Sequence, residues 1–238
     1  GHSSIPPAET AATILSQAVT KISANKLPVN IVPVQKMLAS VAGDLPLHQK
    51  VVAANIGLLK PFVSLFAERV PTLNAFVRTT TAPTMLQGSP KSNVLPTEAV
   101  AIVNHRIMPG ETGESVKAFV TKVIDDDRVS VEFDGGYGNP SKVASVSSEG
   151  FLSISKTIKQ IAQEDPIIFT GLLPAATDTR HYGEVSDDQY RFIYAEINMN
   201  ENRFHGTNER IKVTSYLEAV KFFVQLIKNS DSTAPESN

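Results

Sequence analysis

The order of its periodic segments is the feature that most constrains the fold of this chain. Three stretches of alternating residues predict strands, the first two of them rich in β-branched residues and paired antiparallel, and two stretches with apolar residues at helical spacing predict helices. In chain order these are a helix over 8–23, strands over 75–81 and 99–107, a helix over 112–125 and a strand over 128–133. This order is most of a ferredoxin-like α+β unit, with its first strand missing.

The remaining sequence predicts an insertion and a second domain. Proline breaks alternate with short helical runs over about 26–74, which indicates a helical insertion in the first domain. A turn-rich stretch from Gly135 to Pro140 then ends that domain near residue 138. Further on we expect a helix over 151–163, strands over 167–173 and 190–194, and a helix over 213–229. We therefore expect domains over 1–138 and 139–229, the second of α/β type, and a disordered tail over 230–238.

Composition excludes several classes of protein. The net charge is −2 and no run of Lys and Arg exceeds two residues, so neither a nucleic acid nor an anionic membrane is an expected partner. The chain has no cysteine, which excludes disulfides, thiolate zinc sites and cysteine nucleophiles. Ser3-Ser4 lacks the frame of a serine nucleophile, and Gly135-Gly136-Tyr137-Gly138 is not followed by a helix, as a phosphate-binding loop would be.

Five motifs point to a known family. They are Gly1-His2-Ser3-Ser4-Ile5-Pro6-Pro7, Asn93-Val94-Leu95-Pro96-Thr97-Glu98-Ala99, Asn104-His105-Arg106-Ile107-Met108-Pro109-Gly110, Thr177 to Tyr182, and His205 to Ile211. These motifs, and the order in which they occur, resemble those of the carboxypeptidase S-like branch of the co-catalytic zinc metallopeptidases. This branch also contains N-acyl-amino-acid hydrolases. The resemblance covers nearly the whole chain.

The resemblance implies a metalloenzyme whose first half is not in this chain. Family members carry most ligands of a two-zinc centre, and the catalytic base, upstream of the position of Gly1. We therefore expect a lid domain, able to form a homodimer, and the C-terminal part of an α/β catalytic domain. The intact protein would cleave the amide bond beside a free carboxylate in peptides or N-acyl amino acids, while this chain alone would be inactive. A vacuolar or extracellular location is suggested by the family alone.

Two histidines are candidates for the chemistry. The resemblance makes His205 a metal ligand, and neutral imidazole is a common nitrogen donor to zinc. It makes His2 a donor to the developing oxyanion, often reaching the site of a neighbouring subunit. The alternatives are a loop histidine bonded to backbone for His205 and a cloning remnant for Gly1-His2. A non-catalytic binding or dimerisation module remains the alternative function.

Three further residues are candidates for substrate binding. The resemblance places Asn93 and Arg106 on the substrate's carboxylate, and a guanidinium can grip a carboxylate through two hydrogen bonds. Arg180 is expected to bind the terminal carboxylate, with Asp178 supporting its loop. The alternatives are a turn residue for Asn93 and a solvated strand residue for Arg106. Pro174-Ala175-Ala176 stands where the family frame has glycine, which reduces the freedom of the loop backbone.

The other candidate residues are given supporting roles. Glu209 is expected to buttress its loop or to form an ion pair, because the family's catalytic base belongs to the upstream segment. We expect structural roles for His105 and His181, and a solvent-exposed side chain for His48.

Overall fold

The computed structural model describes residues 1–135, 138–173 and 177–231. They form two compact units, one within 1–141 and 171–173 and the other within 142–170 and 177–231. The predicted disordered end of the chain and the Pro174-Ala175-Ala176 stretch lie outside the described residues, apart from 230 and 231, as do two residues of the turn-rich stretch. Among the described helices, none combines the length and apolar character needed to cross a membrane.

The first unit is built on an antiparallel pair of strands, β1 (Thr80–Gln87) and β2 (Val100–Arg106). The register pairs Thr80 with Arg106 and Gln87 with Val100, with an irregularity between Pro83 and Met85. The strand predicted over 75–81 therefore starts too early. Residues up to Val77 belong to helix α5 (Pro71–Val77), where a proline in the first turn favours a helix.

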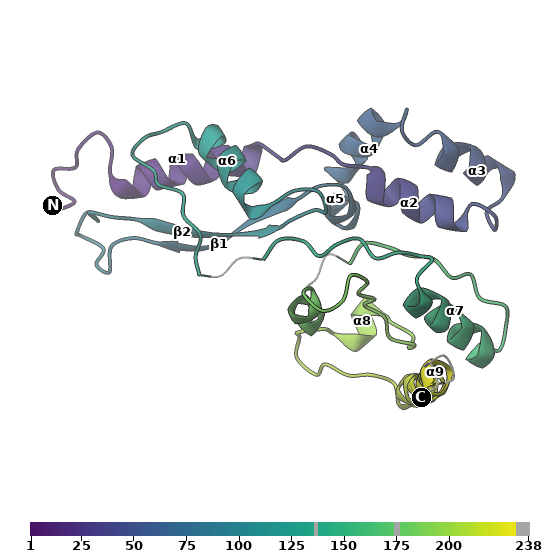
Figure 1. Cartoon of the computed structure of the whole chain (residues 1–238). Helices are drawn as coiled ribbons and strands as arrows, with labels where there is room; N and C mark the ends of the chain where they lie inside the picture. The colour runs from purple at the N-terminus through teal and green to yellow at the C-terminus, as the bar shows by residue number, and fades with distance from the viewer. Residues whose placement is uncertain (136–137, 174–176, 232–238) are drawn as a thin grey trace. The chain divides into compact units, whose positions relative to one another are not determined.

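Two helices cover one face of this pair, α1 (Ala11–Ala24) and α6 (Gly113–Ile124), as Figure 1 shows. Each helix begins at a threonine, Thr10 or Thr112, whose side chain accepts a backbone hydrogen bond from the first turn. Their apolar faces meet in a core in which Ile22 and Val120 are buried, and Val103 of β2 packs against that core. Helical periodicity had predicted both elements.

A group of short helices forms the insertion predicted over 26–74. These are α2 (Val32–Val41), α3 (Leu47–Ala54), α4 (Lys60–Ala67) and α5. They enclose a second small core around Val34, Ile56, Ala67 and Val77. The insertion is therefore packed separately from the layer formed by α1 and α6.

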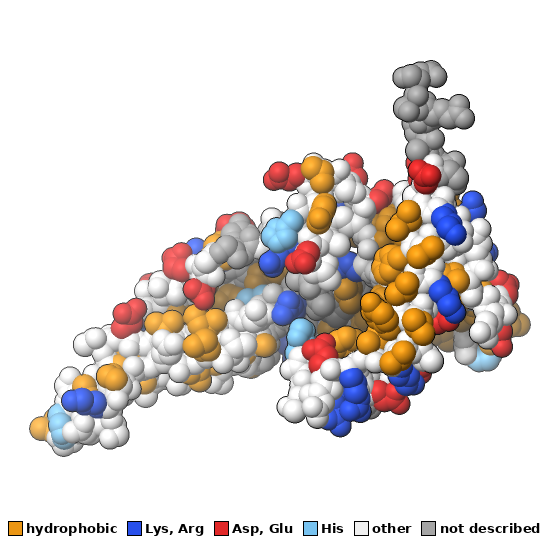
Figure 2. All heavy atoms as spheres, turned by 90° about the horizontal axis from the view of Figure 1, so that it is seen from below, with side chains coloured by type: hydrophobic (Ala, Val, Ile, Leu, Met, Phe, Trp, Pro, Cys, Tyr) orange, Lys and Arg blue, Asp and Glu red, His pale blue; other side chains and the backbone are white. Residues whose placement is uncertain are grey.

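The second unit rests on two helices, α7 (Glu149–Ile161) and α9 (Val213–Asp231), with η1 (Asp178–Tyr182) and α8 (Met199–Asn202) in the chain between them. Phe222 of α9 is 1% exposed and packs against the rings of Phe192 and Tyr194. A buried polar contact joins the helices, because Asn229 Nδ2 lies 2.8 Å from Thr157 Oγ1. Other apolar side chains of α9 remain exposed, and Figure 2 shows orange side chains gathered along this helix.

Three predicted strands are wrong in this structure. Residues 128–133, 167–173 and 190–194 adopt no strand conformation, and no backbone hydrogen bond pairs them into a sheet among the described residues. The physical reason is that a strand needs a neighbour for its backbone groups, and the only described sheet has two strands. The structure therefore shows a mixed α+β fold whose described sheet is a pair of antiparallel strands.

Candidate functional site

The N-terminal residues are fixed against the loop that joins β1 to β2. His2 and Val94 form an isolated antiparallel bridge, and the backbone N–H of Leu95 donates to the carbonyl of Gly1 over 2.8 Å. Figure 1 shows the N-terminus beside the tip of the β1–β2 pair. His2 therefore occupies a defined position in the first unit, although it is the second residue of the chain.

The ring of His2 is held by its near neighbour Ser4. The backbone N–H of Ser4 donates to His2 Nδ1 over 3.2 Å, and the Ser4 hydroxyl lies 2.8 Å from the same nitrogen. A backbone N–H can only donate, so Nδ1 accepts, and the neutral ring carries its proton on Nε2. The side chain of His2 is exposed, so this proton faces solvent and potential ligands.

Asn93 lies beside this proton. Its Nδ2 is 3.5 Å from His2 Nε2, across 91 residues of sequence. Turning the Asn93 amide by half a turn would put its carbonyl oxygen there as an acceptor for the Nε2 proton. The structure thus brings together two of the five predicted site residues, and both are exposed.

Arg106 lies at the other end of the strand pair. It is the last residue of β2, it pairs with Thr80 at the first position of β1, and its side chain is exposed. The strand rise places the two ends of β2 roughly 20 Å apart. Within one copy of the chain, Arg106 and Asn93 therefore do not converge on one carboxylate.

His105, next to Arg106, has the structural role predicted for it. Its Nδ1 lies 3.1 Å from the hydroxyl of Thr81 on β1. Burial lowers the pKa of the His105 imidazole because the charged ring loses hydration. His105 therefore ties the two strands together as a neutral ring at neutral pH.

Arg180 lies in η1 of the second unit. Its Nε donates to Nε2 of the neighbouring His181 over 3.1 Å. Thr177 caps the short helix by accepting from the backbone N–H of Thr179, and Arg191 Nε also donates to the Thr177 hydroxyl over 3.3 Å. The loop is thus fixed by its own hydrogen bonds. The Arg180 side chain is exposed, and its Nε is directed by His181.

His205 lies in a tight loop between α8 and α9. Its φ is 58°, a left-handed conformation that is uncommon for a residue with a side chain, and Arg203 and Asn208 share it with φ values of 52° and 61°. Glu209 accepts a hydrogen bond from the backbone N–H of His205 over 3.3 Å, which fits the buttressing role predicted for it. The strained backbone holds the imidazole in an exposed position.

Asn202 closes this loop at its base. The side chain is 5% exposed, its Oδ1 accepts from the backbone N–H of Asn198 over 2.7 Å, and its Nδ2 donates to the carbonyl of Arg210 over 3.0 Å. The backbone N–H of Arg210 returns a bond of 3.0 Å to the Asn202 carbonyl. The conformation at His205 therefore depends on a buried amide three residues earlier.

The described residues do not hold a metal by themselves. Over 1–135, 138–173 and 177–231 no group of three or more His, Cys, Asp or Glu side chains is placed to bind an ion. A two-metal centre needs several such ligands. His205 could supply one ligand, and the others would come from elsewhere.

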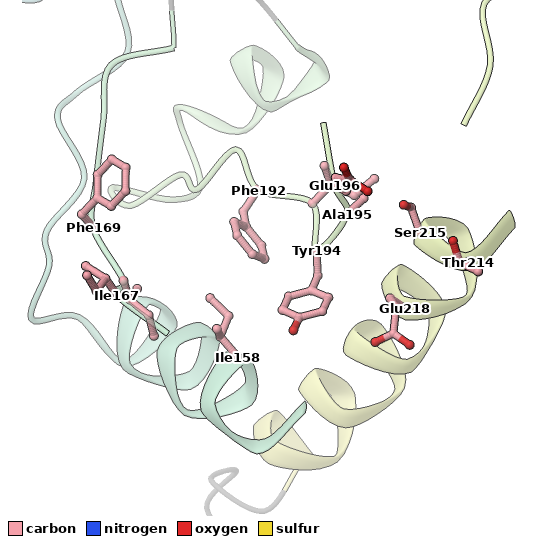
Figure 3. Close-up of a pocket in the computed structure, with 12 residues that line it drawn as sticks. Ile158, Ile167, Phe169, Phe192, Tyr194, Ala195, Glu196, Thr214, Ser215 and Glu218 are labelled. Carbon is pink, nitrogen blue, oxygen red and sulfur yellow. The ribbon is translucent and has the colours of Figure 1, made fainter. Parts of the chain in front are cut away.

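A large apolar cavity of about 660 Å³ lies within the second unit. Figure 3 shows Ile158 of α7, the rings of Phe169, Phe192 and Tyr194, and Glu218 of α9 around it. Phe169 is 56% exposed and Phe192 42% exposed, which is unusual for large apolar side chains in a finished core. None of the five predicted site residues lines this cavity.

The family of the chain follows from a match that covers more than half of it. Residues 1–132 match the family model described as a peptidase dimerisation domain of the M20 type. The chain belongs to the M20 peptidase family. This confirms the resemblance carried by the five motifs. The M20 match covers the strand pair, α1, α6 and the helical insertion.

The relatives with similar sequences are named either as N-fatty-acyl-amino acid synthase/hydrolases or as carboxypeptidases. The chain is 36% identical to an N-fatty-acyl-amino acid synthase/hydrolase of Danio rerio, over 97% of the chain and 45% of the relative. It is 34% identical to a probable carboxypeptidase S-like protein of Dictyostelium discoideum, over 97% and 44%, and 25% identical to carboxypeptidase S of Saccharomyces cerevisiae, over 98% and 47%. The chain spans less than half the length of these relatives. No solved structure matches significantly.

Two residues that fix the geometry at His2 and at His205 were not predicted from the sequence. Ser4 was considered only as a nucleophile, although a polar residue two positions after a histidine can bind its ring. Asn202 sits outside the motif that starts at His205, and no periodic pattern marks it. Ser4 orients the ring of His2 and Asn202 holds the backbone of the His205 loop. The order of motifs along a sequence does not reveal such contacts.

Proposed function

We propose that the whole protein is a zinc-dependent carboxypeptidase or N-acyl-amino-acid hydrolase, to which this chain contributes residues 1–138 as a ferredoxin-like lid and 139–229 as the later part of the catalytic domain. The single observation that carries the proposal is the contact between His2 and Asn93 at the tip of the strand pair. Two residues from separate motifs, 91 positions apart, meet with a donor proton exposed. The family relationship supplies the reaction class.

In this proposal His2 acts through its Nε2 proton. A hydrogen bond from that proton would stabilise the negative charge that develops on the amide oxygen when water attacks. Removal of one such donor typically costs about 10²- to 10³-fold in kcat. Ser4 sets the required tautomer in advance, and Asn93 lies ready to contact the same part of the substrate.

The substrate's carboxylate is assigned to the arginines. Arg180 is directed by His181, and Arg106 is exposed at the base of the strand pair. The His2–Asn93 pair lies near the Val100 end of β2, and Arg106 is the residue at the other end of this strand. We therefore propose that an active site draws on two copies of the chain in a homodimer, with His2 and Asn93 entering from the partner copy.

The metal centre and the rest of the catalytic domain would come from a further segment of the protein. His205 is the proposed zinc ligand from this chain. The segments predicted as strands over 167–173 and 190–194 line the apolar cavity together with α7 and α9. α9 is apolar on most sides, with Leu217, Phe223 and Ile227 exposed, as expected for a helix of a larger domain. We propose that a further segment of the protein packs into this cavity and covers its apolar side chains.

Complementation between two inactive variants tests the proposal. In the full-length protein, His2→Ala and His205→Ala each remove activity from a homodimer. If His2 acts across subunits, the mixed dimer regains one working site, and an equal mixture recovers about one quarter of the wild-type rate by random pairing of subunits. No recovery, with mixed dimers shown by mass spectrometry, would contradict the two-copy site.

An activity assay with and without a metal chelator distinguishes the proposed zinc enzyme from a non-catalytic dimerisation module. The full-length protein should hydrolyse an N-acyl amino acid and lose that activity with a chelator, while the 238-residue chain alone shows no turnover with zinc added. A stable, inactive full-length protein would favour the non-catalytic dimerisation module instead. The dimerisation-domain match alone is compatible with that module.

A further inference from the structure

A second, smaller cavity lies in the first unit, where the C-terminal end of α1 meets the start of β1. It has a volume of about 100 Å³ and is lined by Asn25, Lys26, Asn74 and the run Arg78 to Thr81, with Ile22 and Ser23 completing the wall. None of the five predicted site residues lines it. The cavity therefore needs an explanation that the proposed catalytic function does not give.

The unusual member of this lining is Arg78. It is 4% exposed, and its NH2 group donates to the Ser64 hydroxyl over 3.2 Å. Its Nε is buried and has no hydrogen-bond partner in the part of the chain that the structure describes. No Asp or Glu in that part forms an ion pair with it. A buried guanidinium without a counter-charge is costly, so an anion bound beside it would stabilise the fold.

The neighbouring groups favour an anion over other occupants. Lys26 lines the cavity from an exposed position and adds a second positive charge. The nearest acid in the hydrogen-bond network is Glu111, which accepts from the Thr79 hydroxyl and does not line the cavity. Asn74, which also lines the cavity, has a buried Oδ1 without a partner among the described atoms.

We propose that this cavity binds a compact oxyanion, a phosphate or carboxylate group, through the guanidinium of Arg78 with the ammonium of Lys26 at its edge. The guanidinium presents paired donors that match two oxygens of either group. The volume admits a small ion or the end of a larger molecule and excludes a bulky ligand. The site is independent of the catalytic function proposed above.

Binding of small anions to the 238-residue chain tests this site. Inorganic phosphate and sodium acetate should each be titrated at constant ionic strength against sodium chloride, with heat of binding and Tm as readouts. We expect saturable heat and a rise in Tm with at least one of the two anions. Phosphate binding more tightly identifies a tetrahedral ligand, and acetate binding more tightly a carboxylate. A response equal to that of chloride for both anions would overturn the proposal.

Two variants and a matched control locate the binding. Arg78→Met removes the buried charge without leaving an unpaired one, so the chain should fold while its affinity falls about ten- to hundredfold. Arg78→Lys keeps the charge but loses the paired donors, and should bind with intermediate affinity. Arg69→Met changes an exposed arginine of the same unit and should bind as the wild type does. Unchanged affinity in both Arg78 variants would also overturn the proposal.

Discussion

The backbone N–H of Ser4 lies 3.2 Å from Nδ1 of His2 and fixes which ring nitrogen carries the proton. A main-chain donor cannot reverse its role, unlike a hydroxyl. The neutral ring is therefore the Nε2–H form, which can donate to a ligand beside Asn93.

The tautomer can be measured directly. In the ¹⁵N-labelled 238-residue chain above neutral pH, His2 should show a protonated Nε2 and an unprotonated Nδ1 in long-range ¹H–¹⁵N spectra. Ser4→Ala removes the hydroxyl but keeps the backbone donor, so the same tautomer should persist. A ring with its proton mainly on Nδ1 would contradict the assignment.

The loop that carries His205 should depend on Asn202. Asn202→Ala leaves the backbone N–H of Asn198 and the carbonyl of Arg210 without their buried partner, which costs about 1–3 kcal/mol. We expect a lower free energy of unfolding and faster hydrogen exchange across residues 198–210. Thr207→Ala, at an exposed position of the same loop whose φ is not positive, is the control for general loop effects. Equal behaviour of the two variants would show that the buried amide does not hold the loop.

His205→Ala in the full-length protein should separate metal binding from folding. The side chain is exposed, so its loss should change Tm little in the presence of chelator. Bound zinc, measured by elemental analysis, should fall. Zinc stoichiometry equal to wild type would show that His205 is not a ligand. His181→Ala, another exposed histidine of the second unit, provides the comparison.

Specificity for a free carboxylate should depend on Arg106 and Arg180. Methionine at either position removes a charge-assisted contact, which would cost about 1.5–3 kcal/mol in kcat/KM for substrates with a free C-terminus. The corresponding C-terminal amides should be affected much less, so the ratio of the two rates should shrink. Equal losses on both substrates would assign the arginines a structural role.

Stability should vary with pH through His105. Burial lowers its pKa in the folded state, so the unfolded chain binds more protons as the pH falls below about 6.5, the ordinary histidine value. The free energy of unfolding of the first unit should therefore decrease from pH 7.5 toward pH 5. His105→Gln should flatten this slope relative to wild type, while His48→Gln, at an exposed position, should not. Identical slopes in all three proteins would exclude His105 as the cause.

Local sequence patterns predicted the helices well, because the residues that cap a helix and form its buried face lie within or next to that helix. Thr10 and Thr112 mark the beginnings of α1 and α6, and the apolar spacing behind each gives the buried face. The start of β1 was misplaced because the alternation over 75–81 overlaps the end of α5, where the proline at 71 and the burial of Val77 favour a helix. Periodicity alone does not decide between two such elements.

The site was predicted unevenly for a physical reason. The motif order indicated His2 and Asn93, but only tertiary structure brings residues 91 positions apart within 3.5 Å. The same structure separates Asn93 from Arg106, which are only 13 residues apart, because a strand runs between them. The segments over 167–173 and 190–194 are apolar enough for buried strands, yet strand formation depends on partners that the described residues do not supply.

The separate core of the helical insertion has a consequence for how such chains can diverge. Val34, Ile56 and Ala67 pack among themselves and with Val77, while Ile22 and Val120 belong to the other core. Substitutions that repack the insertion therefore leave the layer over the strand pair intact. We therefore expect that these helices can be reshaped as a unit, giving new surfaces without altering the loop that holds His2 in place.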